Sequence, residues 1–288
     1  MDFTIKQYQQ LLESLQNAGF FFQTFAEYIQ NEDLNRDQQI SAKVQKNKNS
    51  NPPNQNKLIV LRHDVDARPQ NSLRFAQIQT KRGIKGTYYF RIVPQSYNEK
   101  IIREIANLGH EIGYHYETMD TCTGDVDKAY DEFCRNLEKL REIAPINTIS
   151  MHGSPLSKFD NRDIWKKYDY HKLGMLGEPY FDINFNELFY LTDTGRRWDG
   201  YVYNIRDKAT KENPVTNKEF LNLRFQSTSD IIKAIESGTF PYHAMLNFHP
   251  QRWNNKSLPW IKELFWQNIK NQIKRILLLW HKNRGKPT

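Results

Sequence analysis

Apolar runs alternate with amphipathic stretches along most of the chain. Leu58 to Leu61 is a run of four apolar residues, which is typical of a strand buried on both faces of a parallel sheet. Apolar residues at helical spacing within 72–82 predict a helix that ends at Gly83. Because strands and helices alternate in this way further along the chain, the sequence predicts an α/β fold with a parallel sheet or barrel.

The same pattern predicts the other elements. Helices are expected at 4–16, 25–29, 72–82, 99–108, 125–143 and 229–236. Strands are expected at 20–22, 58–61, 86–92, 110–117, 146–152, 188–192 and 242–248.

Two stretches depart from this alternation. Residues 35–57 are polar and have no apolar period, which predicts a loop or disordered insertion. The expected organisation is therefore an N-terminal segment at 1–57, a main domain at 58–255 and a basic C-terminal helix at 256–288. That last helix contains I-L-L-L-W and is expected either to dock on the main domain or to lie on an anionic membrane surface.

The composition of the chain limits which binding partners and which cellular compartment are expected. The formal net charge of +8 favours anionic partners, but no zinc-finger spacing or Arg-rich arm is present, so nucleic acid is not expected as a partner. Cys122 and Cys134 have no metal-binding spacing and are expected to be reduced thiols. The first residues lack the pattern of an export signal, so we expect a soluble, cytoplasmic protein.

Ionisable side chains follow five of the predicted strands. Because the carboxyl ends of parallel strands lie at the same end of a sheet, these side chains are expected to meet there. Histidine and carboxylate ligands together suit a divalent ion such as Zn²⁺. The alternative is that Asp64 and Asp66 have a purely structural role and cap the next helix, although one aspartate would be enough for a cap. The five groups are Asp64 with Asp66, His115 with Glu117, His152, Asp193, and His249.

Three segments resemble motifs of the polysaccharide deacetylase family, the NodB-homology enzymes of carbohydrate esterase family 4. The segment L-R-H-D-V-D fits its first motif, G-H-E-I-G-Y-H its second, and N-F-H-P its fifth. The resemblance implies a distorted (β/α) barrel of about seven parallel strands. It also implies a metal-dependent hydrolase, with Zn²⁺ as the expected metal, that removes an N-acetyl group from an amino sugar.

The resemblance implies roles for individual residues. Asp64 would be the catalytic base, Asp66 and His115 metal ligands, and His249 the acid that protonates the leaving nitrogen. The family has a second metal-binding histidine where this chain has Met119.

Two side chains are candidates to replace that missing ligand. Glu117 would project beside His115, since side chains two apart share one face of a strand. His152 stands at the next strand end, in the place of the family's third motif, which M-H-G-S-P does not match closely.

Further side chains are predicted to bind substrate or to support the site. Asp193 with Trp198 is similar to the family's fourth motif, although the spacing is loose. Arg62 could pair with a carboxylate, and His63 could either support the site or pack against aromatic side chains. His110 is expected to be structural. The predicted supporting residues are Arg62, His63, Asp193, Trp198 and Arg252.

The absence of an export signal shapes the expected substrate. A cytosolic member of the family would meet precursors of surface polysaccharide, and the phosphates of nucleotide-linked or lipid-linked sugars agree with the positive charge. Two alternatives stay open. The chain could be a pseudoenzyme that binds carbohydrate or protein without turnover, or a glycosidase that works with two carboxylates.

Overall fold

The computed structural model describes residues 2–44, 56–153, 157–198 and 217–255, and the statements below concern these residues. The expected C-terminal helix lies outside them. The strands are β1 (Phe21–Gln23), β2 (Leu58–Val65), β3 (Thr87–Phe90), β4 (Glu111–Tyr116), β5 (Ile146–Met151), β6 (Phe189–Thr192) and β7 (His243–Phe248). The α-helices are α1 (Ile5–Asn17), α2 (Phe25–Val44), α3 (Pro69–Thr80), α4 (Glu99–Asn107), α5 (Thr118–Thr121), α6 (Val126–Arg141), α7 (Pro179–Asp182), α8 (Lys218–Asn222) and α9 (Thr228–Glu236). Short 3-10 helices are η1 (Asn161–Lys166), η2 (Tyr170–Leu173) and η4 (Pro250–Arg252).

The seven strands form one parallel sheet in the order β5-β4-β3-β2-β7-β6, with β1 added beside β2. Strand β7 pairs with Leu58–His63 along one edge of β2, while β1 and then β3 pair along its other edge. The end strands β5 and β6 do not pair with each other in the described part of the chain. The sheet is therefore a distorted, incomplete barrel, and the predicted α/β fold is confirmed.

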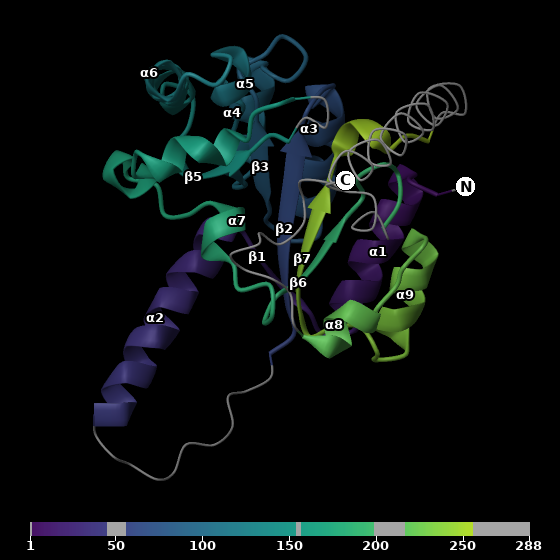
Figure 1. Cartoon of the computed structure of the whole chain (residues 1–288). Helices are drawn as coiled ribbons and strands as arrows, with labels where there is room; N and C mark the ends of the chain where they lie inside the picture. The colour runs from purple at the N-terminus through teal and green to yellow at the C-terminus, as the bar shows by residue number, and fades with distance from the viewer. Residues whose placement is uncertain (1, 45–55, 154–156, 199–216, 256–288) are drawn as a thin grey trace, which may run out of the picture.

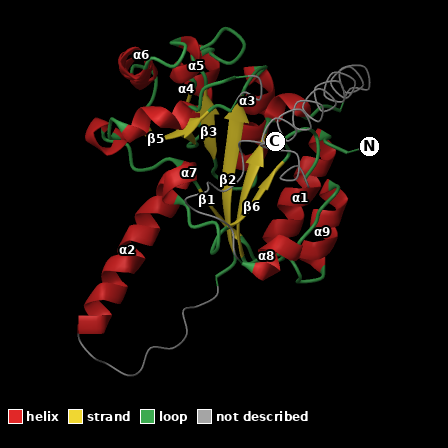
Figure 2. Cartoon of the chain, viewed as in Figure 1, coloured by secondary structure: helices red, strands yellow, loops and turns green. Residues whose placement is uncertain are grey.

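The two faces of β2 differ in character. The face with Ile59, Leu61 and Val65 belongs to the large core that packs against the surrounding helices, and Figure 2 shows those helices flanking the strands. The opposite face carries Leu58 and Val60 in a smaller core and then becomes polar toward the carboxyl end of the strand. The polar end of this face is where the sequence places the site.

The start of α2 and the segment from Leu176 to Leu188 supply the rest of the smaller core. Phe25, Tyr28 and Ile29 pack there with Ile183 and Leu188. Residues on β2, β3 and β7 complete the cluster, so the inner face is filled with side chains below the polar end.

Helix α2 is longer than the sequence pattern indicates. The predicted helix ended at Ile29 and a loop was expected from residue 35, but α2 continues to Val44 and projects away from the sheet in Figure 1. Its start is fixed locally, because the Thr24 hydroxyl accepts from the Glu27 amide and the Glu27 carboxylate accepts from the Thr24 amide. A polar helix without an apolar stripe resembles a loop when only periodicity is read.

No helix among the described residues is both long enough and apolar enough to cross a membrane.

Candidate active site

The polar end of β2 places three charged side chains on one face. Arg62 and Asp64 lie within the strand and Asp66 follows directly after it, and residues two apart on a strand share a face. His115 comes from β4, and His152 and His249 come from just beyond β5 and β7. The strand-end groups predicted from the sequence therefore meet at one end of the sheet.

The Asp66 carboxylate lies at the centre of this group. Its Oδ1 atom is 3.6 Å from His115 Nε2 and 3.8 Å from His152 Nε2, and its Oδ2 atom is 3.8 Å from His249 Nε2. Burial opposes ionisation of Asp66, but the three imidazoles outweigh it and hold the pKa of this carboxyl well below its usual range. Within the described residues, Oδ1 is a buried oxygen without a hydrogen-bond partner.

Each of the three imidazoles has an oxygen beside its Nδ1 atom. His115 Nδ1 donates to the Ser150 carbonyl at 2.9 Å, and His249 Nδ1 donates to Asp193 at 2.6 Å. His152 Nδ1 lies 3.0 Å from a Glu117 oxygen, although the alignment falls short of a hydrogen bond. A proton held at Nδ1 leaves the Nε2 lone pair free, and all three Nε2 atoms face Asp66.

Asp66, His115 and His152 could hold a divalent metal ion. A buried oxygen without a partner, flanked by two imidazole Nε2 atoms, is a donor set that suits Zn²⁺. The separations of 3.6 and 3.8 Å slightly exceed the roughly 3.4 Å between ligands of a tetrahedral zinc ion. As they stand, no three or more histidine, cysteine, aspartate or glutamate side chains of the described residues lie close enough together to hold a metal ion.

Asp64 accepts more hydrogen bonds than Asp66. Arg62 donates to both of its oxygens, at 2.8 and 2.9 Å, and Asn247 donates to Oδ2 at 2.9 Å. Burial raises the pKa of Asp64, but Arg62 and the nearby histidines outweigh burial and lower it well below the usual range. Asp64 Oδ2 also lies 3.9 Å from His115 Nε2. An ionised carboxylate therefore stands beside the candidate metal ligands.

Asp193 orients His249. This fully buried carboxylate accepts from the His249 amide and ring, from Arg252, and from the Trp253 indole at 2.6 Å. Burial opposes the charge, but His249 and Arg252 lower the pKa of Asp193, so it is ionised. Asp193 and Arg252, which were predicted to support the site, therefore lie beside His249, and their roles stay predictions.

Glu117 supports His152 through a contact with its ring. Arg91 donates to both Glu117 oxygens, and together with His152 it outweighs burial and lowers the pKa of Glu117 to about 2. Because both oxygens are taken by these partners, His152 is better placed than Glu117 to complete a metal site.

Three residues lie away from the strand-end group. His63 is on the other face of β2, where it donates to the Thr87 carbonyl and stacks on Tyr88, so it packs in the aromatic core. Trp198 is also in the large core and donates to Thr228. Its indole N–H is thus used by Thr228, and the predicted supporting role of Trp198 stays a prediction. Met119 is buried in the same core.

The sequence reading missed four side chains. Arg91 follows β3 as the other site residues follow their strands, so the strand-end rule could have found it. Asn247 and Gln251 flank His249 at two-residue spacing, which is a signal only when the site is already known. Trp253 donates its indole N–H to Asp193 and was not among the predicted residues.

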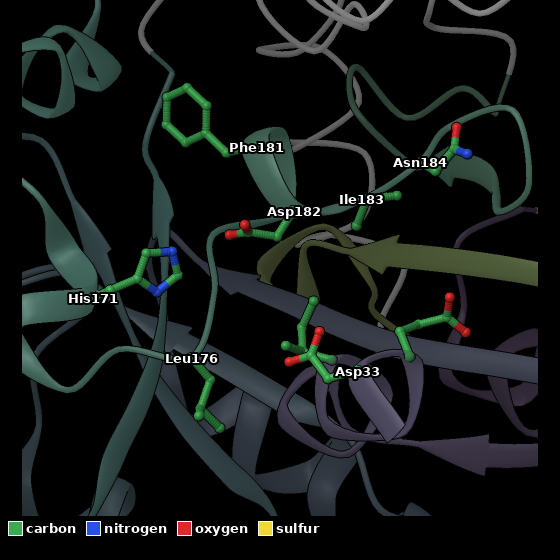
Figure 3. Close-up of a pocket in the computed structure, with 9 residues that line it drawn as sticks. Asp33, His171, Leu176, Phe181, Asp182, Ile183 and Asn184 are labelled. Carbon is green, nitrogen blue, oxygen red and sulfur yellow. The ribbon is translucent and has the colours of Figure 1, made fainter. Parts of the chain in front are cut away.

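Two hollows on the described surface lie away from the strand-end group. One of about 400 Å³ lies between α2 and the segment around α7, lined by Asp33, His171, Phe181 and neighbours (Figure 3). Another of about 600 Å³ includes Tyr242 and His243, at the amino end of β7. No strand-end side chain lines either of these two hollows.

Comparisons with known proteins add little to this geometry. No family model matches the sequence, and a search of curated proteins finds no significant match. Among solved structures, a CE4 family pseudoenzyme from Bacillus anthracis aligns at 13% identity with a TM-score of 0.41, over 76% of this chain and 61% of that one. The catalytic domain of a peptidoglycan N-acetylglucosamine deacetylase from Eubacterium rectale aligns at 16% identity and a TM-score of 0.40, over 78% and 90%.

A family 4 carbohydrate esterase from Bacillus subtilis aligns at 16% identity and a TM-score of 0.35, over 80% of this chain and 90% of that one. This chain spans less than two thirds of the length of the Bacillus anthracis structure. At such low identity and TM-score, the similarities name carbohydrate esterases as neighbours and carry no argument about the chemistry of this chain.

Proposed function

We propose that this protein is a metal-dependent hydrolase that removes an N-acetyl group from an amino sugar. The observation that supports the proposal best is the approach of His115 and His152 to the unpartnered oxygen of Asp66, with the ionised Asp64 beside them. An orphaned buried oxygen costs free energy unless a ligand satisfies it. A cation is the ligand that two imidazoles and a carboxylate bind.

Asp66, His115 and His152 would hold the metal. When bound, the ion would polarise the acetyl carbonyl and acidify a water molecule.

The remaining chemistry falls to Asp64 and His249. Asp64 takes a proton from the attacking water, since its oxygens lie next to the candidate ligands and it is ionised. When the His249 ring carries a proton on both nitrogens, it donates the Nε2 proton to the departing nitrogen, while Asp193 accepts from Nδ1–H and stabilises the imidazolium.

Zinc titration combined with acetate release tests the proposal. The purified chain, stripped with a chelator, is expected to bind about one Zn²⁺ and then to release acetate from N-acetylated oligosaccharides. A chain that folds but binds no zinc, and releases no acetate when metal is added, would favour a carbohydrate-binding protein without turnover. Release of reducing ends without acetate would favour a glycosidase.

We further propose that the substrate is a phosphate-bearing precursor of a surface polysaccharide, such as a nucleotide-linked or lipid-linked amino sugar, met in the cytoplasm. The net charge of +8 supports this assignment. Activity on a nucleotide-linked N-acetyl sugar should then exceed activity on long chitin. Activity restricted to the polymer would contradict the assignment while leaving the reaction type intact.

A further inference from the structure

The hollow between α2 and the segment around α7 (the α2–α7 hollow, Figure 3) has the size and the mixed lining of a small-molecule site. Its volume of about 400 Å³ lies within the roughly 300 to 1,000 Å³ that such sites usually have. Apolar side chains form part of its wall and a few polar side chains form the rest. In small-molecule sites the apolar part packs against the ligand, and the polar groups select and orient it.

The charged side chains of the α2–α7 hollow all have the same sign. Glu32 and Asp33 come from α2, and Asp182 comes from the end of α7. No lysine or arginine is among the described residues that line the hollow, although the whole chain has a formal net charge of +8. A concave site lined by one sign of charge attracts ligands of the opposite sign. The α2–α7 hollow therefore favours a cation.

Two of the lining side chains are held in place by hydrogen bonds that leave an acceptor atom available. Asp182 Oδ2 accepts from the Tyr170 hydroxyl at 2.8 Å and from the Glu178 amide at 2.6 Å, while Oδ1 accepts from no other described residue. His171 Nδ1 donates to the Met175 carbonyl at 3.0 Å, so Nε2 of the neutral ring can only accept. A ligand that enters the hollow is therefore expected to supply hydrogen-bond donors.

The lining favours an organic cation over a metal ion. No three histidine, cysteine or acidic side chains of the described residues, those of the α2–α7 hollow included, lie close enough together to hold a metal ion. Phe181 also lines the hollow and is 44% exposed, so its ring is accessible to a ligand. Leu176 and Ile183 add apolar surface. An ammonium group can pair with the acids and is also attracted to the face of an aromatic ring.

We propose that the α2–α7 hollow binds a small organic ammonium ion, whose nitrogen pairs with the acidic side chains and whose carbon skeleton packs against Phe181 and Leu176. The proposal does not depend on hydrolase activity, because no strand-end side chain lines the hollow. A sugar with a free amino group and a linear diamine both have this chemistry. They differ in the hydroxyl donors that only the sugar offers to acceptors such as His171 Nε2.

NMR of the methyl groups in the full chain tests the proposal, because Ile29, Leu176 and Ile183 place methyl groups on the wall of the hollow. The probes are glucosamine, putrescine and N-acetylglucosamine at mildly acidic pH, where the first two are cations and the third is neutral. We expect glucosamine or putrescine to shift these methyl signals in a saturable way and N-acetylglucosamine to leave them unchanged. The tighter binder of the two cations shows whether the site suits an amino sugar or a diamine.

Two variants, each with a matched control, locate the binding. Glu32→Gln removes one charge from the wall, so the dissociation constant of the bound cation should rise about 2- to 5-fold. Glu104→Gln changes a half-buried glutamate on α4 and should leave it unchanged. Phe181→Ser removes the ring and should raise the dissociation constant by a similar factor of about 2 to 5. Phe21→Ser, at a phenylalanine on β1 that is 41% exposed, is its control.

The proposal is overturned if neither cation shifts the three methyl signals, or if N-acetylglucosamine shifts them equally. It is also overturned if Glu32→Gln and Phe181→Ser bind the cation as tightly as the wild type, because the cation would then be held elsewhere. If a variant does not fold, the comparison of the three probes on the wild-type chain still decides. These readouts need neither metal nor turnover, so their failure and the failure of the proposed hydrolase are independent of each other.

Discussion

Asp64 and Asp66 are two residues apart, share a face and carry the same functional group, yet their surroundings give them different roles. Asp64 receives two hydrogen bonds from Arg62 and one from Asn247. Asp66 receives one on Oδ2 from Gln251, and its Oδ1 atom stays open toward His115 and His152. A carboxylate with an open oxygen can bind a cation, whereas the donors around Asp64 fix its orientation and keep it ionised.

Replacing each acid by its amide tests this division. Asp66→Asn should abolish zinc binding, because it removes the charged oxygen between the two imidazoles. Asp64→Asn should keep the metal and lower kcat by roughly 10²- to 10⁴-fold, the usual contribution of a general base. Zinc titration by calorimetry and acetate release are the two measurements. Equal loss of metal in both variants would show that the roles are assigned wrongly.

The second prediction concerns Glu117, which contacts His152 and is bound by Arg91. The negative charge of Glu117 orients this imidazole and increases its basicity. Glu117→Gln removes that charge, so zinc affinity should fall about 10- to 100-fold. Glu132→Gln is the matched control, since Glu132 is half-buried and bonded to Thr121 on α5, away from the three imidazoles. An unchanged affinity in Glu117→Gln would rule out the supporting role.

At the scale of elements, most helices and strands could be predicted because local signals agree with the fold. Thr4, Asn98 and Asp125 each accept a hydrogen bond from an amide in the first turn of the helix they precede, and such caps are visible in sequence. The predicted range of helix α2 ended too early because the polar sequence after Ile29 shows no helical repeat of apolar residues. The strand-end histidines were predictable from the parallel order of the strands.

The finer assignments within the site depend on contacts between distant segments. The hydrogen bond from the Trp253 indole to Asp193 spans 60 residues of chain, and no local pattern encodes it. Gln251 and Asn247 likewise reach carboxylates on β2 that lie more than 180 residues earlier. Spacing along the chain can identify the types of residue in a site but not these pairings.

The third prediction concerns Asn161, which connects two elements of secondary structure. Its side chain accepts from the Met119 amide at the start of α5 and donates to the His152 carbonyl at the exit of β5. Asn161→Ala leaves these buried groups unpaired and should lower the free energy of unfolding by about 2 kcal/mol, measured by urea denaturation. Asn136→Ala, which removes one bond to the Tyr114 hydroxyl, should cost less. Equal losses would contradict the bridging role of Asn161.

At the scale of the whole molecule, two histidines buried in the large core make stability depend on pH. Burial lowers the pKa of His63 to about 3 and that of His110 to about 4. Because both values lie below the roughly 6.5 of an unfolded histidine, the unfolded chain binds more protons as the pH falls. The stability that neutral histidines preserve above pH 6.5 is therefore lost progressively in acid.

The fourth prediction follows from His110. Between pH 7.5 and 5 this group should lower the free energy of unfolding by about 2 kcal/mol, and His110→Gln should remove that part of the change. Burial raises the pKa of Glu178 to about 7, so Glu178 changes the free energy of unfolding in the opposite direction as the pH falls. Glu178 is present in both the wild type and His110→Gln, so the difference between their pH profiles reports His110. His243→Gln, which changes an exposed histidine, is the control variant. An equal pH slope in wild type and His110→Gln would contradict the prediction.

The pairing of β2 with β7 also determines when the site can form. The strand that carries Asp64 is made early in synthesis, but the Asn247 that binds it follows 183 residues later. Translation at about 5 to 20 residues per second leaves one edge of β2 without its partner for roughly ten seconds or more. We expect the growing chain to expose an apolar, unpaired strand during that interval, so the end of the sheet that carries the candidate site forms only after β7 has been made and depends until then on protection from aggregation.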